Sequence, residues 1–237
     1  MEIDGDMAEI LGIHMGDGCI SVNKRYHMYY VGGDITEEKE YHDLWVSELL
    51  NKKVFIPLNK RLARYKEYPS VGVYGLYVFD KEVVDFFTKF GIKTGSKKEQ
   101  RVPKEILENK SLIKRFIRGL FDTDGNIYFD KNRSCKTPIN NVPVIKLGTT
   151  SKKLLEEIFC SLKSLGFNPR IKKPYKGKRD KNTVYTLIIY RRGDIKRYIE
   201  EIGFKNNKHM TKWLVFKKQG YLQPRTSLKE RKTILEI

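Results

Sequence analysis

The sequence ILGIHMGDG at residues 10–18 returns in altered form as IRGLFDTDG at residues 117–125, and this pair of stretches decides the fold. Each is a mostly apolar run with a small residue at its third and seventh positions: Gly12 and Gly16 in the first, Gly119 and Thr123 in the second. Residues four apart lie on one face of a helix. Each stretch therefore predicts a helix with a shallow face, and the two together predict a closely packed helix pair.

Both stretches close on Asp-Gly, at Asp17 and Asp124. Glycine is common where a helix ends in a left-handed turn. An aspartate at that end opposes the negative pole of the helix dipole, so helix stability does not explain it. Two carboxylates side by side repel and raise each other's pKa unless a cation neutralises them. The helix pair therefore predicts a metal site where Asp17 and Asp124 meet.

The charge balance indicates a polyanionic partner. The chain has 237 residues, with 47 Lys and Arg against 29 Asp and Glu, and its net charge is +18. A folded protein this basic favours nucleic acid; the alternatives are a ribosomal type of binder or a lysine-rich surface that keeps a heat-adapted protein soluble. Three widely spaced cysteines predict a reducing, cytoplasmic setting and argue against a zinc knuckle. The absence of a long apolar run or a signal peptide predicts no membrane partner.

The rest of the chain repeats in the same order around the two stretches. Four pairs of landmarks recur at a similar offset: Asp17 with Asp124, Thr36 with Ser151, Asp80 with Asp194, and Gly91 with Gly203. An offset that varies by a few residues is what loop insertions produce in a duplicated fold. The prediction is an α+β protein of two αββαββα halves, at residues 1–101 and 112–216. A linker at 102–111 joins them, and a basic tail at 217–237 ends in a short helix after Pro224.

Alternation of apolar and polar residues predicts the strands of each half. In the first half we expect strands at residues 19–25, 28–35, 54–61 and 70–79, with a bulge at Gly32 and Gly33. In the second half we expect a strand after Gly125, then strands at 144–150, near 170–174 and at 183–191.

Both nonapeptides resemble the LAGLIDADG motif of homing endonucleases, and the repeated order around them resembles the single-chain, two-motif members over nearly the whole chain. The resemblance implies two motif helices at a pseudo-two-fold axis, with antiparallel sheets forming a saddle over duplex DNA. It also implies hydrolysis of both strands, leaving 3′ overhangs. The chain departs from the motif at Met15, where the family has Asp and the second copy keeps Asp122, and at Arg118, where the family has a small residue.

The resemblance also implies roles for single residues. Asp17 and Asp124 are the metal-binding acids, with Gly16 and Thr123 directly before them as further metal-site positions. Phosphodiester hydrolysis needs a cation, and hard oxygen ligands suit Mg²⁺, for which Mn²⁺ can substitute. Each half is expected to place one lysine at the site, and the matching positions are Lys97, or its neighbour Lys98, and Lys208. Asp34 matches a position that supports the attacking water in some relatives, although an Asp that ends a strand equally marks a turn.

Outward-facing strand positions are the expected contacts to double-stranded DNA, because β-ribbons fit the major groove and Arg, Asn and Lys read base edges. In the first half these are Ser21, Asn23, Arg25, Asn59 and Arg61. In the second half they are Asn126, Tyr128, Lys146, Arg170 and Lys172. A basic hairpin loop adds Lys176, Lys178 and Arg179, which suit phosphate contact. We expect the protein to act as a monomer.

Two other functions fit the same pattern. One is an RNA maturase that assists splicing, with intron RNA as its partner, and the sequence does not separate it from the nuclease. The other is an inactive DNA-binding regulator, against which the retention of both Asp17 and Asp124 argues. An intein is less expected, because the chain starts at Met1 where an intein has a nucleophilic Cys or Ser, and ends in Leu-Glu-Ile where an intein has His-Asn.

Overall fold

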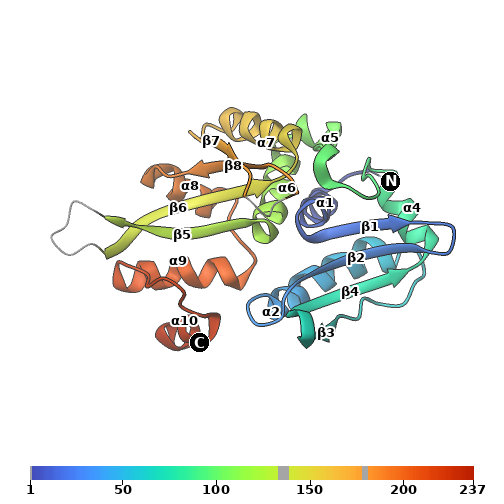
Figure 1. The fold of residues 1–237 in the computed structure, drawn as a ribbon, viewed down its shortest axis with the longest axis horizontal. Helices are drawn as coiled ribbons and strands as arrows, with labels where there is room; N and C mark the ends of the chain where they lie inside the picture. Colours follow the sequence, from blue (N-terminus) through green and yellow to red (C-terminus); the bar gives the residue numbers. More distant parts are fainter. Residues whose placement is uncertain (1, 133–138, 178–180) are drawn as a thin grey trace.

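A computed structural model describes residues 2–132, 139–177 and 181–237, which form two halves of like topology on either side of a central helix pair (Figure 1). The first half contains α1 (Gly5–Asp17), β1 (Gly18–Val22), β2 (His27–Asp34), a helix in four segments (α2 Lys39–Tyr41, η1 His42–Val46, α3 Ser47–Leu50, η2 Asn51–Phe55), β3 (Lys66–Tyr68), η3 (Pro69–Val71), β4 (Val73–Phe79) and α4 (Lys81–Thr88). The joining segment contains η4 (Lys97–Glu99) and α5 (Lys104–Leu107). The second half contains α6 (Lys110–Thr123), β5 (Gly125–Asn132), β6 (Ile139–Thr149), α7 (Lys152–Ser164), β7 (Arg170–Tyr175), β8 (Val184–Ile189) and α8 (Arg192–Glu201), and it is followed by α9 (Asn207–Gln219) and α10 (Leu228–Leu235).

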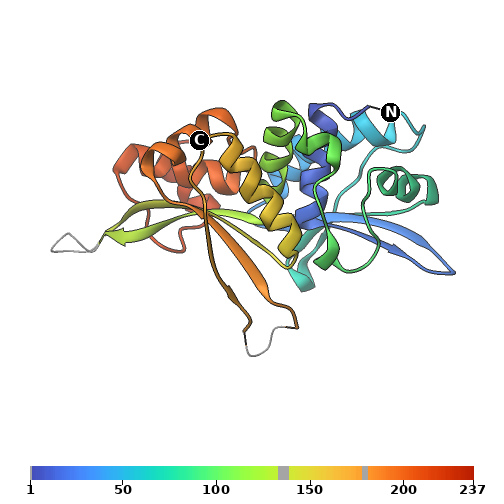
Figure 2. The same ribbon diagram turned by 90° about the horizontal axis from the view of Figure 1, so that it is seen from above.

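The two sheets confirm the predicted duplication. Each is antiparallel and four-stranded, in the order β1-β2-β4-β3 in one half and β5-β6-β8-β7 in the other. Figure 2 shows the helices gathered on one side of the sheets, while the β7–β8 hairpin projects away from them. The core lies between the helices and the sheets, so the opposite sheet faces stay uncovered. No helix in the described residues is long and apolar enough to cross a membrane.

The central pair, α1 and α6, packs through the small residues that the motif predicted. A Cβ atom added to Gly12 would lie 2.1 Å from the Phe116 carbonyl oxygen of α6. Across the pair, a Cβ on Gly119 would lie 2.3 Å from the Glu9 carbonyl oxygen of α1. These are backbone atoms that no rotamer change can move away. The two helices can therefore approach this closely only because both positions are glycine.

The glycines of the two Asp-Gly pairs have another role than the predicted one. Gly18 is extended, with φ −82° and ψ 158°, and Gly125 is not among the glycines with positive φ. A Cβ on Gly18 would lie 2.2 Å from Nδ1 of His14, and a Cβ on Gly125 would lie 2.3 Å from the Phe121 carbonyl oxygen. Each glycine lets a strand start directly against the helix before it, and no left-handed turn is involved.

Two strand predictions in the first half are wrong. Residues 54–61 form no strand: the helix that begins at Lys39 continues through η2 to Phe55, and Asn59 and Arg61 lie in the loop after it. Val54 is buried while Ile56 is 63% exposed, so their alternation does not mark one sheet face. The expected bulge at Gly32 and Gly33 is also absent, because β2 pairs with β4 in continuous register through both glycines.

Helix starts and the C-terminal region complete the comparison. Asp80 and Ser151, two of the repeated landmarks, cap α4 and α7. Asp4 caps α1, and Arg191 occupies the N-cap position of α8. The short helix after Pro224 is confirmed as α10. Helix α9 was not predicted, and the 217–237 segment is no free tail, because Lys217 and Lys218 lie in α9 and α10 packs against that helix.

Candidate active site and nucleic-acid interface

The two motif aspartates meet where α1 and α6 end. Asp17 is the last residue of α1 and Asp124 is the C-cap residue of α6. A Cβ on Gly16 would lie 1.9 Å from Oγ1 of Thr123 and 3.2 Å from the Asp124 nitrogen, so the helix ends touch. Desolvation, followed by the charges of Glu38 and Asp124, raises the pKa of Asp17 to about 8. Desolvation and Glu38 also raise the pKa of Asp124. A cation bound between the two acids would favour their charged forms and oppose both shifts.

A third carboxylate, Glu38, was not predicted as a site residue. It is 5% exposed, and it lies in the segment that joins β2 to the following helix. One carboxylate oxygen accepts from the backbone N–H of Asp34 at 2.8 Å. The other accepts from Nζ of Lys208 at 2.7 Å and from Nδ2 of Asn206 at 2.8 Å. Glu38 thus joins the first half to the lysine of the second half.

The structure places one lysine from each half beside the aspartates. Nζ of Lys97 donates to the Gly16 carbonyl, and its charge acts on both Asp17 and Asp124. Its neighbour Lys98 is exposed, so Lys97 is the one that faces the site. Lys208 reaches the same place through Glu38, and its charge also lowers the pKa of both aspartates.

The loop that leads into α9, and therefore to Lys208, is fixed by the acid of the sixth motif position. Asp122 is fully buried, and its carboxylate accepts from the backbone N–H groups of Lys205 and Asn206 at 3.0 to 3.1 Å. Nδ2 of Asn206 donates to the Asp122 carbonyl oxygen at 2.8 Å. Burial raises the pKa of Asp122 to about 8, although these backbone bonds oppose the shift. Asp122 therefore anchors a loop, and the thioether of Met15 in the first copy cannot accept such a pair of bonds.

Asp34 lies in a turn. Its Oδ1 accepts from the N–H and the hydroxyl of Thr36, at 2.8 and 2.7 Å, and from the N–H of Glu37 at 3.0 Å. Partial burial raises the pKa of Asp34, but these hydrogen bonds outweigh it and hold the pKa below the usual value. These contacts are those of an aspartate that forms a turn, which was the alternative expected for Asp34.

The oxygen ligands at this place suit a Mg²⁺ ion that keeps bound water better than they suit a metal ion held by protein groups alone. Within the described ranges, no group of three or more His, Cys, Asp and Glu side chains is placed to hold a metal ion. Mg²⁺ needs no such cage, because it keeps several waters and is held by one or two carboxylates together with substrate phosphates. Asp17 and Asp124 match that requirement. At the other two predicted positions, the Gly16 carbonyl accepts from Lys97, and the Thr123 hydroxyl donates to the Gly119 and Leu120 carbonyls within its own helix.

The predicted DNA contacts of the first half fall on a strand, a turn and a loop. Ser21 lies on the uncovered face of β1, in register with Met28. Asn23 and Arg25 belong to the exposed turn between β1 and β2, where Oδ1 of Asn23 accepts from two backbone N–H groups. Asn59 has a left-handed backbone with φ 52° and, like Arg61, is exposed in the loop after η2. Only Ser21 therefore lies on a strand.

In the second half the predicted contacts lie on strands and partly in one row. Asn126, Lys146 and Arg170 are connected across the sheet through Ile188, and Lys172 occupies the next outward row. Lys212 of α9 donates to Oδ1 of Asn126 at 2.9 Å. Tyr128 is half-buried on β5, and Lys176 is exposed after β7. Lys178 and Arg179 lie outside the described residues.

Comparison with known proteins agrees with the fold and the motifs. Residues 111–203 match the model of the LAGLIDADG-like domain. The structure is similar to that of a mesophilic variant of the homing endonuclease I-DmoI, with a TM-score of 0.58 at 21% identity over 84% of this chain and 90% of that one. It is also similar to that of a point mutant of I-SmaMI, with a TM-score of 0.54 at 16% identity over 98% and 97% of the two chains. The chain thus has the α+β fold of the two-motif LAGLIDADG structures. Within it, residues 111–203 match the LAGLIDADG-like domain, and the whole chain is similar in fold to single-chain homing endonucleases.

Curated relatives with quite different names contain a segment like this chain. The replication factor C small subunit of Methanocaldococcus jannaschii is 25% identical over 209 residues, which are 88% of this chain and 10% of that protein. The tRNA-splicing ligase RtcB of Methanopyrus kandleri is 29% identical over 214 residues, which are 85% of this chain and 21% of that protein. The chain therefore spans only a tenth to a fifth of these two relatives.

Proposed function

We propose that the protein is a site-specific, divalent-metal-dependent DNA endonuclease that cuts both strands and leaves 3′ overhangs. The observation that carries the proposal is the meeting of Asp17 and Asp124 at the joined ends of α1 and α6, with Lys97 and Lys208 contributed by opposite halves. Two acids and two lysines around one axis suit two strand cuts. The uncovered sheet faces on both sides of that axis give a duplex a surface to lie on.

Mg²⁺ bound by Asp17 and Asp124, with Mn²⁺ able to substitute, would neutralise charge that develops on the scissile phosphates and lower the pKa of a bound water. The protein's own groups do the rest. Lys97 and Lys208 are cations beside the aspartates and are placed to stabilise negative charge on the phosphates. Glu38 holds the Lys208 ammonium, and the Gly16 carbonyl holds that of Lys97, so neither has to be ordered when the substrate arrives. Gly16 and Thr123 serve by holding the helix ends together.

The comparisons support this proposal in two ways. I-DmoI, which shares the fold, has been solved in complex with DNA and Mn, and with DNA and Ca. The relatives named for replication and for RNA ligation share one segment although their names describe unrelated activities, so none of those names predicts what the segment does. A segment found inside such different proteins is what a mobile element produces, and this supports an endonuclease of the homing type. We further propose that it acts inside the cell, as a monomer, on double-stranded DNA.

Substitution of the two acids tests the proposal. We expect Asp17→Asn and Asp124→Asn each to reduce double-strand cleavage in Mg²⁺ by at least about 10³-fold, because each removes a metal-binding charge, while duplex binding in Ca²⁺ stays within a few-fold of wild type. Asp85→Asn on α4 removes one charge elsewhere and is the matched control. Cleavage at the wild-type rate by either site variant would refute the assignment. Absence of any cleavage by wild type, with tight binding to intron RNA or to DNA alone, would favour the maturase or the regulator.

A further inference from the structure

The uncovered face of the first sheet has an unusual composition for a DNA-binding surface. Register pairing aligns Cys19, Tyr30 and Tyr77 across β1, β2 and β4 in one row, and Ser21, Met28 and Phe79 in the next. The alternate residues Ile20, Tyr29, Val31 and Leu76 are buried on the helix side. The six aligned side chains therefore face away from the helices, and all six are uncharged at neutral pH.

Aromatic rings dominate this face. Tyr77 is 43% exposed and Phe79 is 67% exposed. The Tyr30 and Tyr77 rings lie 4.6 Å apart, and Tyr68 approaches Tyr77 edge-on at 5.4 Å. Gly75 leaves room for the Tyr30 ring, because a Cβ there would lie 2.9 Å from it. We call Tyr30, Tyr68, Tyr77 and Phe79 the aromatic face.

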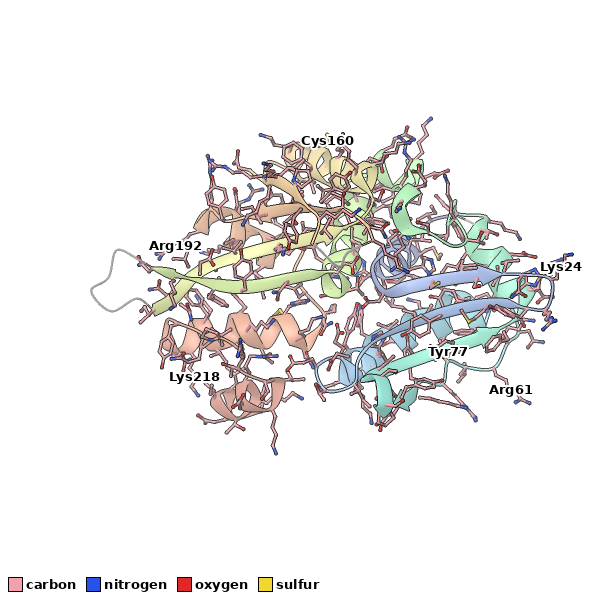
Figure 3. All side chains as sticks on the ribbon, viewed as in Figure 1. Lys24, Arg61, Tyr77, Cys160, Arg192 and Lys218 are labelled. Atoms are coloured by element: carbon pink, nitrogen blue, oxygen red, sulfur yellow. The ribbon has the colours of Figure 1, made fainter. Side chains whose placement is uncertain are left out.

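Basic side chains border the aromatic face without entering it. Arg61, Arg64 and Lys66 line one groove together with Tyr77 and Phe79. Figure 3 shows Tyr77 on β4, Arg61 near the lower edge of this sheet, and Lys24 at the far end of the β1–β2 hairpin. The border therefore suits the phosphates of a polyanion, while the centre offers rings and hydroxyl groups.

The matching face of the second sheet is built differently. The row equivalent to Cys19, Tyr30 and Tyr77 contains Asn126, Lys146 and Ile188, followed by Arg170, and the row equivalent to Ser21 and Met28 contains Tyr128 and Val144. Asn126, Lys146 and Arg170 can donate hydrogen bonds to base edges and to phosphates, whereas the first sheet has Cys19 and Tyr30 at the positions equivalent to Asn126 and Lys146. The pseudo-two-fold axis therefore relates two reading surfaces of unlike chemistry.

We propose that the first half reads a thymine-rich half-site through apolar contact of the aromatic face with thymine methyl groups. This inference rests on the proposed function, since it takes duplex DNA as the substrate. The thymine C5-methyl is the apolar group that the bases present in the major groove. Tyr77 and Phe79 are the most exposed rings of the face. The tyrosine hydroxyls supply hydrogen bonds to base edges beside those methyls.

Duplex DNA is favoured over a second copy of this chain as the occupant. Strand β1 begins directly after Asp17, so the aromatic face is continuous with the site where the phosphates must lie. The net charge of +18 opposes the pairing of two copies through basic borders, whereas it attracts a duplex.

The experiment replaces thymine by deoxyuridine, which removes only the methyl group. Wild-type protein first selects its preferred duplexes from a randomised library in Ca²⁺. Half-sites are assigned by repeating the selection with the double variants Tyr77→Ala/Phe79→Ala and Arg170→Ala/Lys172→Ala. We expect the first double variant to lose the preference for thymine in one half-site. Deoxyuridine in that half-site should weaken wild-type binding about fourfold per contacted methyl, and should not weaken binding by the Tyr77→Ala/Phe79→Ala protein.

The outcomes separate the two proposals. A G·C-rich first half-site, or equal binding of thymine and deoxyuridine duplexes, would overturn the thymine inference and leave the nuclease proposal standing. Selection of no duplex at all would overturn the proposed function itself. A wild-type dimer in sedimentation that Tyr77→Ala/Phe79→Ala converts to a monomer would assign the face to a second copy. Both side chains are exposed, so circular dichroism should show wild-type folding for these variants.

Discussion

Replacing Gly12 by alanine tests the packing on which the site depends. A Cβ atom on Gly12 would lie 2.1 Å from the Phe116 carbonyl oxygen and 3.0 Å from the Leu120 nitrogen, both in the backbone of α6. An ordinary carbon contact needs at least 3.4 Å, so α1 and α6 would have to separate by about 1 Å. Because Asp17 and Asp124 lie at the ends of these two helices, the separation would reach the site.

Two opposing effects set the magnitude. Alanine is favoured over glycine within a helix by about 1 kcal/mol. Overpacking of a close contact costs about 1–3 kcal/mol. Here the new Cβ atom meets backbone atoms, which cannot rotate away, so we expect a cost near the upper end of that range. The free energy of unfolding should therefore fall by about 2 kcal/mol. For a protein of this size that corresponds to a Tm about 4–8 °C lower.

The matched control is Gly193→Ala in α8. A Cβ on Gly193 would meet nothing within 4 Å, so the same substitution should raise the free energy of unfolding by about 0.4–1 kcal/mol. Urea denaturation followed by circular dichroism measures both variants, and a cleavage assay below the Tm follows activity. If Gly12→Ala were as stable as wild type, or more stable, the close helix contact would not exist as described.

Three further predictions concern the charges of the site and the surface. Lys208→Met should nick supercoiled plasmid more than it linearises it, because Lys97 remains for one strand; equal loss of both products would contradict a division of labour between the lysines. Arg231→Met should lower the free energy of unfolding by about 2 kcal/mol, because it leaves the Glu37 carboxylate without its partner. This loss is smaller than the loss expected for a fully buried ion pair, since Glu37 is partly exposed. An unchanged urea midpoint would contradict the prediction. Duplex affinity should fall about 10³–10⁵-fold between 50 and 200 mM salt if about 6–10 phosphates are contacted, and a flat response in a filter-binding titration would argue against a basic saddle.

Local periodic patterns were sufficient to predict the centre of the molecule. The small residues at helical spacing and the two Asp-Gly pairs are visible within each nonapeptide, and the repeated order of elements is visible when the two halves are compared. Lys97 and Lys208 were expected from the family resemblance, at matching positions after the last helix of each half. The fold class was predictable because duplication presents every such signal twice.

Contacts between distant segments could not be predicted in this way. Glu38 is bound to Asn206, 168 positions along the chain, and nothing near Glu38 in the sequence indicates that partner. The prediction of a strand at residues 54–61 was wrong for a related reason. Val54 and Phe55 are both buried in the last segment of the helix, and the apparent alternation with Ile56 came from a residue that faces solvent. Helix α9 was missed, although Asn206 caps it, because polar residues interrupt its apolar face.

The two neighbouring acids Glu37 and Glu38 show why the unit of function extends beyond the matched domain. Glu38 accepts from Lys208 in α9, while Glu37 accepts from Arg231 and from the Leu228 backbone in α10. Arg231 is 1% exposed and also donates to the hydroxyl of Thr211 in α9. The segment after β2 is thus held by two helices that follow residue 203, where the family match ends. Lys208 lies in that C-terminal region and Lys97 precedes residue 111, so the matched domain contains neither of the two lysines that the proposed chemistry uses.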